Sequence, residues 1–152
     1  MAKSATNQSA DILDLADMGM AEESHLTIKI NDKPTNWVWT FAGPSHPKTI
    51  QQSNRLARER LHEDRQKEAA RVNGRKWVPP QEDVEETRLR NINMVVERLI
   101  GWSPINLHGE AFQFSDENAR KVLLDQSKSY ILMQALEFLG NEQHFMPRSA
   151  KT

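Results

Sequence analysis

Two short stretches near the start of the chain alternate apolar and polar residues, which is the period of a half-buried β-strand. The first is HLTIKI at residues 25–30, and the second is WVWTF, in which Trp37, Trp39 and Phe41 share one face. The turn-forming stretch NDKPTN separates them. The pattern predicts a β-hairpin with one apolar face. Because a lone hairpin is marginal in water, other elements or a partner must cover that face.

A long polar helix is predicted over residues 49–72. The breaks at Pro44 and Pro47 end the second strand, because proline lacks the N–H group that a ladder needs. Thr49 and Gln52 have the spacing of a capping box. Apolar positions in this helix are too sparse to form a continuous stripe. We therefore expect its far half to project from the core or to face a partner.

One core helix and two shorter helices are predicted in the second half of the chain. The core helix starts near Asp83, whose side chain can cap it, carries one apolar stripe and ends at Gly101. A second short hairpin is expected around a turn at residues 108–109. The two C-terminal helices follow at residues 115–125 and 127–139.

These elements predict a mainly α fold with a small β part, of the α+β class: an N-terminal β-hairpin, a long polar helix, a core helix, a second short hairpin and two C-terminal helices. A single domain is expected over residues 25–145, between a flexible acidic N-terminal tail (1–24) and a flexible C-terminal tail (146–152). Large apolar side chains from all these elements make up the predicted core: Trp37, Trp39, Phe41, Ile92, Val95, Leu99, Trp102, Phe112, Phe114, Leu123 and Phe138.

Charge is distributed unevenly along the 152 residues, although the whole chain carries a formal net charge of only -1. Residues 1–25 hold five acids and one base, whereas residues 53–76 hold eight bases and four acids. There is no cysteine, so disulfides and cysteine-ligated zinc are excluded. No run of residues has the length and apolarity of a membrane span or a signal peptide, which makes a soluble cytoplasmic protein the default expectation.

No catalytic constellation is recognisable in the sequence. The five histidines form no HxH or HxxxH pair, and there is no GxSxG elbow and no phosphate-cradling glycine loop. Most carboxylates are spaced for pairing with bases on exposed helix faces. The sequence therefore predicts a protein that is not an enzyme and has no metal site and no cofactor.

Binding of a protein partner fits the pattern better than binding of nucleic acid. A stacking surface for bases places basic residues beside its aromatic ones, but Trp37, Trp39 and Phe41 have no such neighbours. A protein-interaction module needs only apolar anchors and charged flanks. The expected contacts lie on the outward side of the polar helix and in the chain ends: Leu13, Leu15, Leu56, Leu61, Arg55, Arg58, Arg65 and Phe145.

The order of segments resembles the tail assembly chaperones of long-tailed bacteriophages and prophages. These segments are WVWTFAGPSHPKT, LARERLHEDRQKEAARVNGRKW, ERLIGWSPINLHGEAFQFSDENARKVLLD and QALEFLGNEQHFMPRSA. The similarity as a whole extends over roughly residues 27–150. The most telling part is GWSPINLHGEAFQFSDENARKVL, in which a tryptophan and a polar turn precede the start of a helix.

The resemblance implies a small, mainly helical protein of the host bacterial cytoplasm that is not expected in the mature virion. Proteins of that family bind the tape measure protein, keep it soluble and help recruit the major tail protein around it. Self-association into a homo-oligomer stays open, and neither a membrane nor nucleic acid is an expected partner. The first alternative is a minor structural protein of the tail or neck. The second is a DNA-binding accessory protein that uses the arginine-rich helix.

Overall fold

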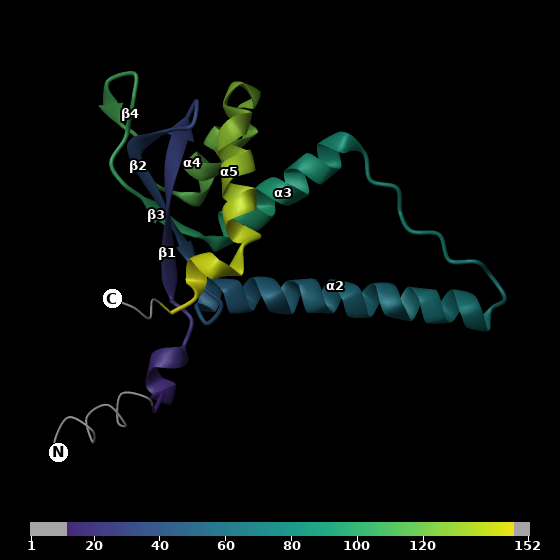
Figure 1. The fold of residues 1–152 in the computed structure, drawn as a ribbon. Coiled ribbons are helices and arrows are strands. Elements are labelled where there is room, and N and C mark those ends of the chain that lie inside the picture. The colour runs from purple at the N-terminus through teal and green to yellow at the C-terminus, as the bar shows by residue number, and fades with distance from the viewer. Residues whose placement is uncertain (1–11, 148–152) are drawn as a thin grey trace, which may run out of the picture.

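The computed structural model describes residues 12–147 and has the expected α+β architecture. A small antiparallel sheet is covered by helices, and one long helix extends away from both (Figure 1). The elements in chain order are η1 (Leu15–Met18), β1 (Glu23–Ile30), β2 (Lys33–Ala42), α2 (Pro47–Val72), α3 (Val84–Arg98), β3 (Leu99–Trp102), β4 (Asn106–Leu107), β5 (Glu110–Ala111), α4 (Asp116–Leu124), η2 (Gln126–Lys128), α5 (Ser129–Leu139) and η3 (Glu142–Phe145).

The main sheet has the strand order β1-β2-β3 and is antiparallel throughout. Asn31 and Asp32 form a two-residue turn that joins β1 to β2, and their φ values are 52° and 63°. Left-handed conformations at both positions are those of a type I′ turn, whose twist matches that of the flanking strands. The register shifts between Thr27 and Lys29. Leu26 and Ile28 contribute to the core, whereas Ile30, next to the turn, is exposed.

The third strand corrects the predicted end of the core helix. Sequence periodicity places Leu99 on that helix and stops it at Gly101, but α3 ends at Arg98. Leu99 has φ -81° and ψ 128°, which is an extended conformation. It starts β3, which pairs with β2 through Trp39 opposite Trp102 and Phe41 opposite Leu99. This long-range pairing adds a strand that the local apolar pattern does not reveal.

The core lies between the sheet and the helices α3, α4 and α5. Phe41 of β2 packs against Phe138 of α5 with ring centroids 5.4 Å apart. Eight of the predicted core residues are buried: Trp37, Trp39, Phe41, Ile92, Val95, Leu99, Leu123 and Phe138. Trp102, Phe112 and Phe114 are only half-buried. Trp102 stacks on Phe112 and meets Phe114 edge-on, at the side of the aromatic cluster near the short β4–β5 hairpin.

Local capping chemistry defines most helix ends. The side chain of Asp83 accepts a hydrogen bond from the Glu86 amide at 2.7 Å, as the sequence predicts for α3. The long helix α2 departs from its prediction. Its N-cap is His46, whose Nδ1 accepts from the Lys48 amide at 3.1 Å, and no Thr49–Gln52 capping box forms. Both residues of that expected box are instead buried.

The ordered contacts of the fold begin a few residues before the predicted start of the domain. β1 begins at Glu23, two residues before the expected boundary at residue 25. The Ala21 amide donates to the Phe145 carbonyl at 2.6 Å, and the Ser24 hydroxyl donates to the His144 carbonyl at 2.6 Å. The start of β1 and η3 therefore lie side by side (Figure 1). Residues 1–11 and 148–152, which belong to the predicted tails, lie outside the described residues.

Candidate interaction surface

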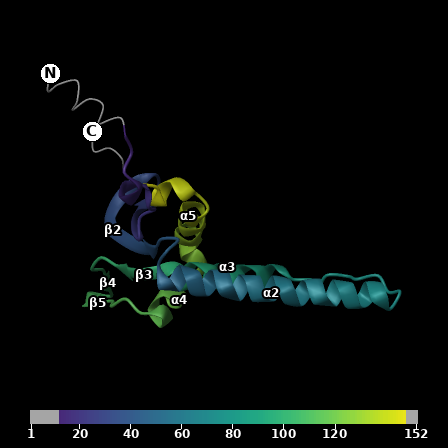
Figure 2. The same cartoon turned by 90° about the horizontal axis from the view of Figure 1, so that it is seen from below.

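The long helix α2 leaves the body of the protein after its first turns. Every residue from 57 to 69 is exposed, and Figures 1 and 2 both show the helix reaching beyond the remaining elements. Its own ion pairs support this exposed part: Arg55–Glu59 at 2.9 Å, Glu63–Lys67 at 3.4 Å and Glu68–Arg71 at 2.5 Å. Such pairs stabilise a helix by a few tenths of a kcal/mol each, about 0.2–0.5. We call residues 57–72 the arm.

A half-buried polar cluster holds the base of the arm on α3. Arg55 donates to both carboxylate oxygens of Glu97, at 2.8 and 2.6 Å. Gln52 donates to the same carboxylate at 3.1 Å and to the Met94 carbonyl at 3.0 Å. Burial alone would raise the pKa of Glu97, but the hydrogen bonds from Arg55 and Gln52 outweigh it and lower the pKa. The bond to Glu97 correspondingly raises the pKa of Arg55.

Three exposed apolar side chains, about 16 Å apart along the axis and separated by polar and charged residues, lie on the outer side of α2. Ile50, Leu61 and Val72 follow one another at intervals of eleven residues and are 47%, 55% and 68% exposed. At about 100° per residue, eleven residues return to within about 20° of the same side of a helix. Gln52, which faces α3, lies about 180° from Leu61 by the same rule. We call Ile50, Leu61 and Val72 the outer stripe.

The linker back from the arm leaves further apolar side chains exposed. Residues 73–83 run from the far end of α2 to the start of α3 (Figure 1). Val78 in this linker is 70% exposed, and Val84 at the start of α3 is 86% exposed. The Lys67 ammonium lies 4.8 Å from the centre of the Trp77 ring, which places this part of the linker against the arm.

The structure separates the predicted contact residues into distinct groups. Leu61 belongs to the outer stripe, whereas Leu56 is half-buried. Five residues of helix rotate the side chain by about 140°, so Leu56 and Leu61 do not share the outward side that was expected. Arg55 is engaged with Glu97 at the base. Arg58 and Arg65 are exposed, and within residues 12–147 they form no ion pair.

The chain ends also divide. Leu13, just before η1, is 78% exposed, and Leu15, the first residue of η1, is 82% exposed. Phe145 is only 2% exposed, which overturns its assignment as a partner contact. Its ring packs edge-on against Phe138 at 5.8 Å and beneath the Arg98 guanidinium at 5.5 Å. Phe145 is therefore a core residue, held between Phe138 of α5 and Arg98 of α3.

The aromatic strand β2 offers no stacking surface for bases. Trp39 and Phe41 have no exposed area, and Trp37 is 8% exposed. Trp37 meets Trp39 and Trp102 edge-on, at centroid distances of 5.3 Å in both pairs. Among the described residues, the indole N–H groups of Trp37 and Trp39 are buried without a hydrogen-bond partner. These rings contribute packing to the core.

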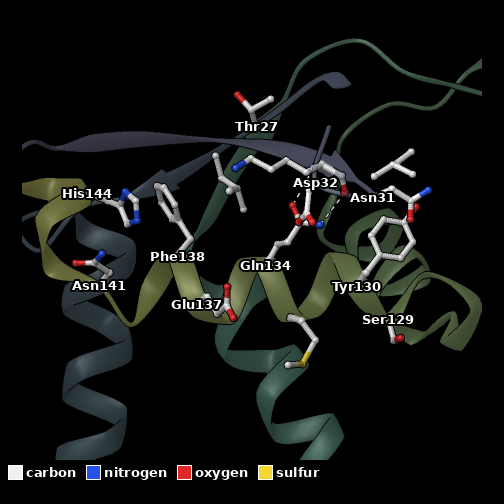
Figure 3. A pocket seen from close by; sticks show the side chains of 14 residues that line it. Thr27, Asn31, Asp32, Ser129, Tyr130, Gln134, Glu137, Phe138, Asn141 and His144 are labelled. Atoms are coloured by element: carbon white, nitrogen blue, oxygen red, sulfur yellow. Dashed lines mark hydrogen bonds between the residues drawn. The ribbon is translucent and has the colours of Figure 1, made fainter. Parts of the chain in front are cut away.

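A pocket of ≈ 830 Å³ lies between the free edge of β1 and helix α5 (Figure 3). Gln134 points from α5 at this edge, where it accepts from the Lys29 amide at 2.8 Å and donates to the Lys29 carbonyl at 2.9 Å. This side chain therefore occupies backbone groups that another strand would otherwise pair with. At the other end of the pocket, His144 stacks on Phe138 at 4.1 Å. The residues that line this pocket thus have structural roles: Gln134 covers the edge of β1, and His144 packs on the core residue Phe138.

Two further histidines, His25 and His62, are engaged in hydrogen bonds with nearby side chains. His25 Nδ1 lies 3.0 Å from the Thr40 hydroxyl, and His62 Nε2 lies 3.1 Å from the Gln66 amide nitrogen. Within residues 12–147, no three His, Cys, Asp or Glu side chains gather in a way that would hold a metal ion. In the same range, no helix combines the length and apolarity needed to cross a membrane.

Comparison of the chain with protein-family models, with curated proteins and with solved structures finds no match.

The outer stripe is not among the sequence-based predictions, although the eleven-residue spacing that marks it is visible in the sequence. A search for the usual three- and four-residue spacing finds only sparse apolar positions in residues 49–72. The eleven-residue spacing of Ile50, Leu61 and Val72 marks a line along the same side of the helix. The structure then makes this line accessible, because only the opposite side of the first turns packs against α3.

Proposed function

We propose that this chain is a phage tail assembly chaperone without catalytic activity, which holds apolar helical segments of a tape measure protein. The observation that carries the proposal is the outer stripe on an otherwise charged, projecting helix. A long helical client exposes an apolar face before it is packed into a tail, and a second helix can lie along such a stripe. The charged flanks of α2 keep the resulting complex in solution.

The size of the outer stripe suits a contact that has to be reversible. Its three large side chains are 47–68% exposed, so a client helix covers only part of each. Complete burial of such a side chain contributes about 1.5–3 kcal/mol, and association costs several kcal/mol in lost freedom. One stripe therefore supports weak binding, and several chains along one client are needed for a stable complex.

Co-expression with the tape measure protein of the same phage or prophage tests the proposal. Leu61→Glu places a charge on the outer stripe and is expected to reduce the soluble, co-purifying tape measure protein severalfold. Met133→Glu is the matched control, because Met133 is 58% exposed on α5, close to the 55% of Leu61. Equal melting curves for both variants would establish that their folds are intact. Equal recovery of the client with both variants would exclude the outer stripe as the binding surface.

Release from the assembled tail separates a chaperone from a minor structural protein, which would use the same surfaces permanently. Mass spectrometry of purified virions is the direct measurement. A chaperone that recruits the major tail protein and then leaves should be absent from virions but present in infected cells. Stoichiometric recovery from virions would favour the structural role.

A second candidate, DNA binding by the arm, is favoured by one observation. Arg58 and Arg65 lie seven residues apart on nearly the same side of α2 and form no ion pair within the described residues. Two free guanidinium groups can contact phosphates, with an affinity that falls as salt rises. A gel-shift experiment with duplex DNA at about 150 mM salt decides this: retardation that Arg58→Glu with Arg65→Glu abolishes would support it.

A further inference from the structure

A second hollow lies at the end of the sheet that carries the Asn31–Asp32 turn. It is a groove of ≈ 440 Å³ between the β1–β2 hairpin, the β4–β5 hairpin and the facing ends of α4 and α5. Its lining is mainly apolar and includes Trp37, Phe112, Val122 and Ile131. We call this the hairpin groove.

The rim of the hairpin groove carries three exposed apolar residues. Ile30 is 48% exposed, Leu107 49% and Tyr130 39%, and all three line the groove. They come from three different elements, β1, β4 and α5, so exposed apolar area borders the groove on more than one side. An apolar occupant would cover all three.

The charged residues on this rim are mainly basic. Lys121, Lys128 and Asp125 line the groove. Lys128 pairs with Asp125 at 2.6 Å, whereas Lys121 reaches only Glu117, at 3.9 Å, and is 63% exposed. Lys121 is thus the rim charge with the weakest attachment to the protein itself. The rim favours an occupant that is apolar and acidic.

The N-terminal segment over residues 12–18 has this composition. Ile12, Leu13, Leu15 and Met18 are 76%, 78%, 82% and 55% exposed. Asp14 and Asp17 lie between them, and the segment has no basic residue. The Asp14 side chain accepts a hydrogen bond from the Ala16 amide at 2.9 Å and starts η1, so the segment is already partly shaped.

Within one copy the segment and the groove lie at opposite ends of the sheet. The segment leads into the start of β1 (Figure 1), whereas Ile28 and Ile30 of the groove lie near the other end of β1, beside the Asn31–Asp32 turn. The eight residues of β1 span about 26 Å at about 3.3 Å per residue. The hydrogen bond from the Ala21 amide to the Phe145 carbonyl fixes the chain just after the segment, and Met20 packs on the core. The segment is therefore directed away from its own groove.

We propose that residues 12–18 of one copy dock in the hairpin groove of a second copy. The apolar side chains of the segment cover Ile30, Leu107 and Tyr130, and its aspartates approach Lys121 and Lys128. The two surfaces lie at opposite ends of the protein, so the contact is heterologous and links copies head to tail. This self-association does not involve the outer stripe and does not depend on the proposed function.

Sedimentation velocity of the full-length chain tests the contact without any client. The wild-type protein is expected to shift to larger species as its concentration rises. The segment variant Leu13→Asp with Leu15→Asp should weaken association by about tenfold or more, because both apolar contacts are lost. The groove variant Ile30→Asp with Leu107→Asp should do the same. Val78→Asp, at a position in the linker that is 70% exposed, is the matched control and should associate as the wild type does.

Mixing the two variants provides the decisive result. The segment variant retains an intact groove, and the groove variant retains an intact segment. An equimolar mixture should form a 1:1 heterodimer that grows no further, at a concentration at which each variant alone is monomeric. A mixture that remains monomeric, a wild type that is monomeric at all concentrations, or association that neither variant weakens would overturn the proposal. Circular dichroism of each variant verifies that the fold survives the substitutions.

Discussion

Gly43 follows β2 at the point where the chain ends meet the sheet, and adding a single methyl group there is a severe perturbation. A Cβ atom on Gly43 would lie 1.9 Å from the Ala21 carbonyl oxygen. No flexible side chain is involved, so the backbone around Ala21 has to move. The Gly43 amide also donates to the Glu22 carbonyl at 2.7 Å, and the Ala21 amide to the Phe145 carbonyl at 2.6 Å. Movement of this backbone strains both hydrogen bonds.

The cost of Gly43→Ala follows from these contacts. Overpacking costs about 1–3 kcal/mol, and each strained hydrogen bond adds up to about 1 kcal/mol. We expect a loss of about 2–4 kcal/mol in the free energy of unfolding, which lowers Tm by about 5–12 °C for a chain of this size. Gly101→Ala is the matched control, because its Cβ would meet nothing within 4 Å. Its φ is not in the left-handed region, so a gain of about 0.4–1 kcal/mol is expected there.

Thermal unfolding followed by tryptophan fluorescence measures both variants, since the cluster of Trp37, Trp39 and Trp102 reports on the core. The expected result is a lower Tm for Gly43→Ala and an equal or higher Tm for Gly101→Ala. Two variants with the same Tm as the wild type would refute the close approach of residues 21–22 to the end of β2. They would also remove the argument that residues 12–18 are held at this end of the sheet.

Two further predictions concern charged groups. Glu97→Ala should lower the free energy of unfolding, measured in urea, by about 1–2 kcal/mol, whereas Glu59→Ala should lower it by at most about 0.5 kcal/mol. The difference is expected because the Glu97 side chain is 29% exposed and the Glu59 side chain 61% exposed. Equal losses would contradict the role of the polar cluster at the base of the arm. The hydrogen bonds from Lys128 and then Ser127 lower the pKa of Asp125 from 3.8 to about 2. This carboxylate therefore stabilises the fold above pH 3.8, and its contribution is lost as the pH falls through about 2. Asp125→Asn should make Tm fall less steeply between pH 3.8 and about pH 2 than it does in the wild type. An unchanged slope would contradict the lowered pKa of Asp125.

Local signals predict most elements of this fold. The asparagine and aspartate of the first turn, the capping side chains of Asp83 and Ser115, and the short hairpin around His108 each act within a few residues. Their effect is therefore readable from neighbouring sequence. The strand β3 is different, because Leu99 continues the apolar period of α3 and Gly101 resembles a helix end. Only the pairing with β2, about sixty residues away in the chain, selects the extended form.

The interaction surfaces show the same division. The exposure of Leu61 and the projection of α2 follow from a helix with few apolar positions, and the sequence predicts both. The burial of Phe145 could not be predicted, because Phe138 and Arg98 reach it from separate elements. The hairpin groove likewise arises where two hairpins and two helices converge. Sequence patterns describe single elements, whereas a groove depends on how those elements pack.

We propose above that the outer stripe of α2 contacts a helical tape measure protein. Site-specific photo-crosslinking in cells that express both proteins tests it most directly, with a benzophenone side chain placed at position 61 or at position 133. We expect a crosslinked product containing the tape measure protein from position 61 and none from position 133. Crosslinks to the client from position 133 alone, or from neither position while the two proteins co-purify, would contradict it.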